Sequence, residues 1–210
     1  MSIRVSGNIY QDYPTLVYSC NVPLSKALKD LIEKPAVLDC TIANTICRIV
    51  CMQVLMGNDF DVYAKTVAED LVEKDSLDRF IFILPHQLSK TLGQASEVPI
   101  GALLTYYNIP EYPKVHPKGM TQAENLYCVE EGKYLGFGSH FTEPKTLAEI
   151  ADDFYEAFML ESPSIAGKEI QLKYKDNKEG FIKALNEKNR SFNVGLLDLD
   201  KIKEARSILK

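Results

Sequence analysis

The chain has 210 residues, of which 46% are hydrophobic and 25% are charged, and its formal net charge is −5. This composition is typical of one compact globular domain, or of one domain with an appendage, that buries a core without disulfide support. A net negative charge without a basic stripe argues against nucleic acid as a partner. The longest apolar stretches are strand-sized or interrupted by Arg48, so we expect no transmembrane helix, and residues 1–5 lack the apolar run of a secretory signal.

In the first third of the chain, residues 1–22 have the pattern of an extended segment that can form an edge hairpin. Residues 23–34 have leucines and alanines at helical spacing, with Pro23 suited to the first helical turn and Pro35 ending the helix. The next helix begins near Asp39 and runs to Met56.

That second helix is apolar over much of its circumference, so we expect it to be central, and Gly57-Asn58 ends it. Residues 61–73 have the pattern of a third helix. The run at residues 80–84 (Phe-Ile-Phe-Ile-Leu) predicts a buried strand that ends at Pro85.

The second half begins with predicted strands. Residues 101–107 are apolar and predict one strand, and residues 124–129 and 133–137 predict two more, joined by a turn at Glu130-Glu131-Gly132. Residues 146–160 form an amphipathic helix in which Thr146 can cap the N-terminus.

Glu149, three residues after Thr146, completes the pattern of a capping box. Beyond this helix the pattern predicts a strand at residues 169–174 and helices at residues 179–187 and 198–209. The predicted order is helices, then antiparallel strands, then helices. This order is typical of an α+β fold and not of repeated βαβ units. No internal repeat and no Gly-rich phosphate loop is present.

The cysteines are odd in number and lack the spacing of a disulfide framework, which indicates a reducing compartment; they are Cys20, Cys40, Cys47, Cys51 and Cys128. Cys47 and Cys51 share a helix face with no second Cys or His pair nearby, so a zinc site has little support. We interpret Cys47, Cys51 and Cys128 as core residues. His86, His116 and His140 form no metal-binding motif, and no metal or organic cofactor is implied.

Cys40 differs from the other cysteines because it lies at the predicted start of the long apolar helix. There the helix N–H groups and the helix dipole favour thiolate over thiol, and the thiolate is the nucleophile. Asp39 can cap the same helix or place a carboxylate beside the sulfur. The alternative interpretation is that Cys40 is a small buried residue, as most free cysteines are.

Several stretches together resemble a known family of thiol enzymes over residues 20–160. They are residues 23–30 leading into 38–43, residues 101–110, and residues 123–128 with 131–138. They look like the bacterial spore-coat protein-glutamine gamma-glutamyltransferase, the small calcium-independent transglutaminase of Bacillus. The resemblance implies an α+β fold with a papain-like or NlpC/P60-like core, in which the cysteine-bearing helix packs on an antiparallel sheet, followed by C-terminal helices. It implies a transglutaminase-like core at residues 1–160, and residues 161–210 would add a strand and helices to the same domain.

The resemblance also implies roles for particular residues. Cys40 would be the nucleophile, Glu124 the catalytic glutamate, and Asp39 the acidic neighbour that can partly substitute for that glutamate. Without the resemblance, Glu124 would more often be a solvated residue at a strand end. The family's histidine aligns with Phe137, which cannot move protons, so His140 or His116 would have to replace it; without that role, His86 and His116 read as surface loop residues beside prolines.

The activity implied is acyl transfer through a Cys40 thioester on a glutamine side chain of a protein substrate. A lysine amine as acceptor gives an isopeptide cross-link, and water gives deamidation. We expect a cytoplasmic location; export without a signal or association with a spore coat are the alternatives. Two other functions stay open: a related cysteine hydrolase or peptidase, and a catalytically inactive binding protein on the same fold.

Overall fold

The computed structural model describes residues 4–8, 11–17, 22–33, 40–74, 80–95, 98–137, 141–190 and 192–209. The chain forms two compact units: unit 1 comprises Met1–Lys90 and Leu197–Lys210, and unit 2 comprises Thr91–Leu196. The predicted boundary after residue 160 falls inside unit 2. The described residues combine helices with a five-stranded sheet of antiparallel pairs, so the predicted α+β class is confirmed.

Unit 1 begins with the hairpin expected for residues 1–22. Strands β1 (Arg4–Asn8) and β2 (Gln11–Val17) pair antiparallel, with Arg4 opposite Val17 and Asn8 opposite Gln11. Among the described residues these two strands form a sheet of their own.

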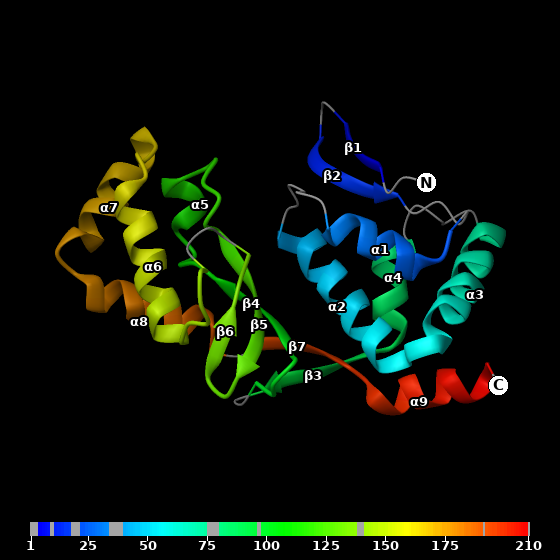
Figure 1. Ribbon diagram of the computed structural model, residues 1–210. Helices are drawn as coiled ribbons and strands as arrows, with labels where there is room; N and C mark the ends of the chain where they lie inside the picture. Colours follow the sequence, from blue (N-terminus) through cyan, green and yellow to red (C-terminus); the bar gives the residue numbers. More distant parts are fainter. Residues whose placement is uncertain are drawn as a thin grey trace. The chain divides into compact units, whose positions relative to one another are not determined.

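The described part of unit 1 also contains these helices (Figure 1): α1 (Leu24–Ile32), α2 (Cys40–Met56), α3 (Phe60–Glu73), α4 (Phe80–Gln87) and α9 (Leu199–Ile208). The helices predicted for α1, α2, α3 and α9 are confirmed, and Pro23 is the N-cap of α1. Ser25 binds Asp61 through its backbone N–H (2.8 Å) and its hydroxyl (2.5 Å), which ties α1 to α3. The core of this unit includes Leu24, Leu28, Ile46, Ile49, Met52, Phe60, Ala64, Phe80 and Leu84.

Helices α2 and α3 follow one another with only the short helix η1 (Gly57–Asp59) between them. Gly57 has a φ of +59°, a backbone conformation that glycine adopts without steric cost. By length and composition the stretch Cys40–Glu73 is apolar enough to cross a membrane, but the core helix of a soluble protein passes the same test. This is weak evidence, and the absence of a membrane span stays a prediction.

The strand predicted at residues 80–84 is wrong, because this segment forms helix α4. Phe80, Ile81, Leu84 and Leu88 are all buried, which is the spacing of one helical face. A short apolar run is consistent with either a strand or a buried helix segment. Pro85 lies in the last turn of α4 and does not end the element where the sequence suggested.

Unit 2 is built on the five-stranded sheet, whose order is β3-β7-β4-β5-β6. Its centre is the antiparallel pair β4 (Leu103–Tyr107) and β5 (Ala123–Glu130), with Leu104 opposite Leu126 and Tyr106 opposite Glu124. β6 (Lys133–Leu135) pairs with β5, as the predicted turn at Gly132 requires. The three strands predicted from residues 101–137 are therefore confirmed.

Two further strands, β3 (Ser89–Ala95) and β7 (Phe192–Leu197), were not predicted from the sequence. Both contain a glycine, which is depleted in strands. β7 pairs with β4 through Leu103 and Gly195, far apart in the chain. Such pairing depends on tertiary structure, so a short local pattern does not indicate it.

Helices α6 (Leu147–Leu160) and α8 (Lys178–Lys188) cover one face of the sheet, and α7 (Lys168–Lys175) packs against both of them (Figure 1). The predicted capping box of α6 is present: Thr146 Oγ1 accepts from the Glu149 N–H (3.3 Å), and the Glu149 carboxylate accepts from the Thr146 N–H (2.7 Å). The core between helices and sheet includes Leu104, Tyr106, Leu126, Ile150, Phe154, Phe158, Tyr174, Phe181 and Leu185.

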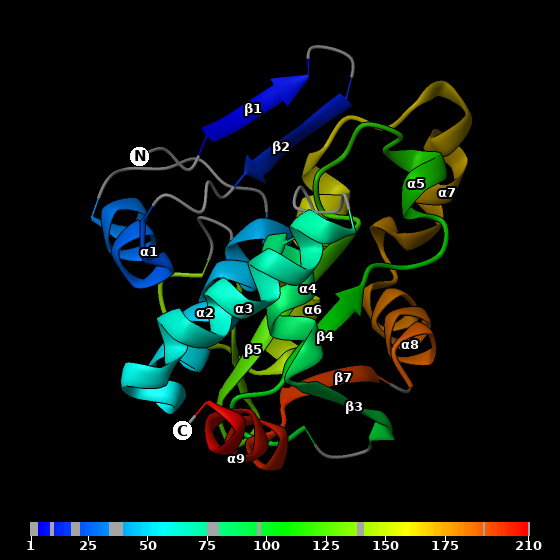
Figure 2. The ribbon, with the colours of Figure 1, turned by 90° about the vertical axis from the view of Figure 1, so that its right-hand side faces the viewer.

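The strand predicted at residues 169–174 is also wrong, because this segment is helix α7. Ile170, Leu172 and Tyr174 alternate with polar residues and so imitate the two-residue period of a strand. In the helix, Ile170 and Tyr174 share a face and pack on the core, whereas Leu172 is 63% exposed. Figure 2 shows α7 beside the short helix α5 (Tyr112–Val115), which the sequence did not indicate.

Candidate functional site

Cys40 is the first residue of α2, as predicted, and its side chain is half-buried. The backbone N–H groups of a first helical turn lack intrahelical acceptors, so this end of α2 favours negative charge. Two further predicted site residues, Asp39 and His140, lie outside the described residues. Cys40 belongs to unit 1 and Glu124 to unit 2, and each is described here within its own unit.

The other cysteines divide into two groups. Cys128 is buried, and its thiol donates to the carbonyl oxygens of Val98 (3.4 Å) and Glu130 (3.2 Å), so its prediction as a core residue is confirmed. Cys51 is exposed and Cys47 is only half-buried, so the prediction that Cys51 belongs to the core is wrong. Cys20 lies outside the described residues.

Glu124 occupies an inward-facing position of β5, not a solvated strand end. Alternate residues of β5 face the helices, and Glu124 (8% exposed) shares that side with Leu126 and Cys128. Tyr106 lies opposite Glu124 on β4, and its ring contacts Phe154 of α6 with the ring centres 5.7 Å apart. The carboxyl group therefore lies among the aromatic side chains that line the interior of unit 2.

This environment raises the pKa of Glu124 from 4.5 to about 7. Burial is the main cause, because it disfavours the carboxylate, and the negative charge of Asp153 on α6 adds to it. Asp153 itself binds Lys145 (Nζ–Oδ2 2.7 Å). Burial also raises the pKa of Tyr106 to about 12. At neutral pH, Glu124 is therefore poised to both accept and donate a proton.

Sequence reasoning missed Asp153 and Tyr106 as the neighbours of Glu124. In the sequence, Tyr106 is one residue of an apolar stretch and Asp153 is one of several acidic residues of an amphipathic helix. Their relation to Glu124 depends on the register of β4 with β5 and on the packing of α6 over the sheet. No short motif encodes either feature.

Phe137, which aligns with the family's histidine, follows β6 and is 38% exposed. Its ring lies edge-on to Tyr127, with the ring centres 6.3 Å apart. Tyr127 and Asn125 leave β5 on the side opposite to Glu124, and Asn125 accepts a hydrogen bond from Thr105 there (3.0 Å). The side chain at position 137 thus packs against the sheet face that does not carry Glu124.

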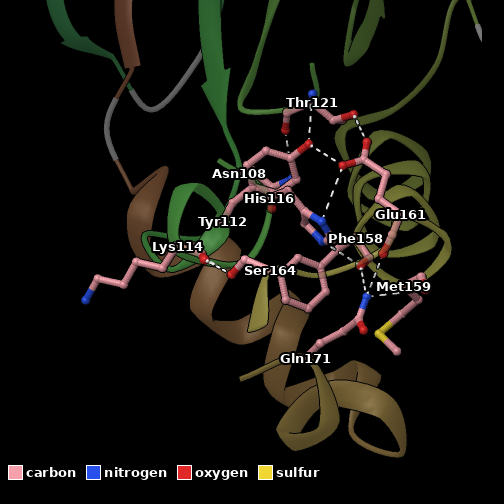
Figure 3. A network of polar contacts seen from close by, with 10 residues as sticks. All are labelled: Asn108, Tyr112, Lys114, His116, Thr121, Phe158, Met159, Glu161, Ser164 and Gln171. Atoms are coloured by element: carbon pink, nitrogen blue, oxygen red, sulfur yellow. Dashed lines mark hydrogen bonds and ion pairs between the residues drawn. The ribbon is translucent and has the colours of Figure 1, made fainter. Parts of the chain in front are cut away.

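His116 is buried (4% exposed), so the prediction of a surface loop residue is wrong. Its Nε2 lies 2.9 Å from the carbonyl oxygen of Phe158, and because a carbonyl only accepts, Nε2 is the donor. Its Nδ1 lies 3.6 Å from Oε2 of Glu161, as Figure 3 shows. Both ring nitrogens are therefore directed at the end of α6 and not at Glu124.

The same network fastens the loop after α5 to the end of α6. The Tyr112 hydroxyl donates to Glu161 (3.0 Å) and accepts from the Thr121 N–H (3.0 Å), as drawn in Figure 3. A pocket of about 480 Å³ lies beside it, lined by residues 116–120 and 161–164. Gly119 approaches so closely that a Cβ there would lie 2.7 Å from Oε2 of Glu161. These contacts hold the loop after α5 against the end of α6, and His116 takes part in them, so we interpret its role as structural.

No group of three or more His, Cys, Asp or Glu residues gathers in the described part of the chain. Comparison with protein-family models, curated proteins and solved structures gives no match for this chain. The functional argument therefore rests on the residues themselves.

Proposed function

We propose that this protein is a transglutaminase-like thiol acyltransferase that acts on glutamine side chains of a protein substrate. The observation that carries the proposal is the Glu124 carboxyl, which is buried in β5 and has a pKa of about 7. A residue with a strongly shifted pKa is a candidate for acid–base catalysis. It occupies the position that the sequence resemblance assigns to the catalytic glutamate.

Cys40 supplies the nucleophile in this proposal. It is the first residue of α2, at a helix end that favours negative charge, and its side chain is half-buried. A free thiol is required, so we propose that the protein works in a reducing, cytoplasmic compartment. Asp39 and His140 keep their proposed roles as acidic neighbour and proton carrier, and both lie outside the described residues.

The proposed reaction has two halves. In the first, the Cys40 sulfur forms a bond to the glutamine carbonyl carbon, the C–N bond breaks, and the leaving nitrogen takes up a proton to depart as ammonia. In the second, a lysine amine or water forms a bond to the same carbon, the C–S bond breaks, and a proton from the amine or water restores the Cys40 thiol. Glu124 is suited to both transfers because neither of its protonation states is strongly favoured near neutral pH.

The finer description of the fold is also a proposal. A cysteine that begins a helix and is followed in the chain by antiparallel strands is the order of a papain-like or NlpC/P60-like core, and α2, β4, β5 and β6 follow that order. A related cysteine hydrolase would share these parts and differ only in using water as the acceptor.

A catalytically inactive binding protein is the second candidate function, and one observation favours it. Phe137 stands where the family has its histidine, and its ring packs on Tyr127, away from the sheet face that carries Glu124. A binding protein that kept the fold without the chemistry would tolerate this substitution.

The rate at which Cys40 is alkylated by iodoacetamide, followed against pH by peptide mass spectrometry, tests the proposal. Exposed Cys51 in the same chain is the internal reference, and Glu130→Gln, an exposed carboxyl on the same strand as Glu124, is the matched control. We expect Cys40 to react faster than Cys51. Glu124→Gln should change this profile and Glu130→Gln should not.

The binding protein would be favoured if Cys40 is alkylated no faster than Cys51. The same conclusion requires that the rate of Cys40 alkylation is unchanged in Glu124→Gln, Asp39→Asn and His140→Ala. If the thiol is activated, incubation with a glutamine-containing protein separates the remaining candidates. Incorporation of a primary amine indicates transfer, release of ammonia without incorporation indicates deamidation, and peptide-bond cleavage indicates a peptidase.

A further inference from the structure

Two cysteines of α2, Cys47 and Cys51, form a pair that the proposed chemistry does not use. They are four residues apart and so lie on one face of the helix. Cys51 is exposed and Cys47 is half-buried, so solvent reaches the pair.

The spacing of the pair suits a bridging atom better than a direct bond. Side chains four apart on a helix have Cβ atoms about 5–6 Å apart. A disulfide needs Cβ atoms about 3.5–4.5 Å apart, so closing one would distort the helix. A metal bound by two thiolates at about 2.3 Å each holds the sulfurs up to about 4.6 Å apart, which rotation of the two side chains can reach.

We propose that Cys47 and Cys51 form a two-sulfur binding site for a soft monovalent cation of the Cu(I) type. Thiolates are the ligands that Cu(I) prefers. Zinc fits less well, since structural zinc takes four ligands and no group of three or more His, Cys, Asp or Glu residues gathers in the described ranges.

Binding exchanges protons for the metal without any redox step. Each thiol loses its proton to solvent, two sulfur–metal bonds form, and copper remains Cu(I) throughout. The negative charges of the two thiolates are then shared with one cation.

An anaerobic titration of the full chain with Cu(I), in competition with a chromogenic Cu(I) chelator, tests the site. We expect a tight site that takes one ion per chain and releases protons on binding. Cys47→Ser and Cys51→Ser should each weaken it on the order of 10²-fold or more, because the second sulfur acts at a high effective concentration. Cys20→Ser, Cys40→Ser and Cys128→Ser should retain it.

A spacing variant provides the matched control. Cys51→Ala combined with Leu55→Cys keeps the number of thiols and the helix face but moves the second sulfur about 6 Å further along the helix, so it should lose the tight site. The two changed positions are exposed, and far-ultraviolet circular dichroism checks that α2 is retained. Unchanged affinity in Cys51→Ser or in the spacing variant overturns the proposal. Cu(I) binding that is retained in Cys40→Ser does not depend on the proposed nucleophile. The metal site and the proposed enzyme activity can therefore be tested separately.

Discussion

Replacing Glu124 by Gln removes a buried group that ionises near neutral pH, and its effect on stability has a defined dependence on pH. The pKa of Glu124 is about 7 in the folded protein against an ordinary value of 4.5. Below about pH 4.5 both the folded and the unfolded chain hold the proton, so the raised pKa has no effect on stability. Between these two values the unfolded chain ionises while the folded chain does not, and stability falls as pH rises.

Above about pH 7 the penalty is complete, and the gap between the two pKa values corresponds to about 3 kcal/mol. Glutamine has nearly the same shape and no charge, so we expect Glu124→Gln to be more stable than wild type by up to about 3 kcal/mol at about pH 8. The advantage should disappear at about pH 4.

Urea unfolding of both proteins at several pH values measures this difference, with Glu130→Gln as the control on the same strand. Glu130 is exposed, so its substitution should leave the pH dependence of wild type unchanged. A stability difference between wild type and Glu124→Gln that is the same at low and high pH would refute the reasoning, because it would mean that Glu124 titrates alike in the folded and unfolded chains.

Three further substitutions test unit 2. Asp153→Asn removes the second cause of the raised pKa and frees the Lys145 charge, so the carboxyl stretch of Glu124 in infrared spectra should titrate at lower pH than in wild type. Thr146→Ala removes the cap of α6 and should cost about 1 kcal/mol in urea unfolding, whereas Thr146→Ser should cost little. Gly119→Ala places a Cβ 2.7 Å from a carboxylate oxygen and should cost about 1–3 kcal/mol, while Gly195→Ala, whose Cβ would have 4.0 Å to its nearest neighbour, should lower the melting temperature much less.

The sequence predicts where individual residues of the candidate site lie along the helices and strands, but it does not predict which of them become buried. The place of Cys40 at the head of α2 follows from a local pattern of apolar residues, which the structure retains. The burial of Glu124 depends on which side of β5 faces the helices, and that is decided by Leu126 and Cys128 pairing their side chains with α6 and α8. His116 was misplaced for the same reason, because a Pro-flanked loop residue becomes buried only when α6 packs over it.

Local signals determined most elements of this chain. Helical spacing, proline and the Thr146–Glu149 box marked α1, α2, α3 and α6, since these features act within a few residues of the backbone they stabilise. Tertiary structure decided the rest. An apolar run became α4 and an alternating run became α7, because burial against neighbouring helices outweighs the weak preference of short segments. It also decided that Glu124 titrates near neutral pH, since a pKa depends on neighbours that only folding brings together.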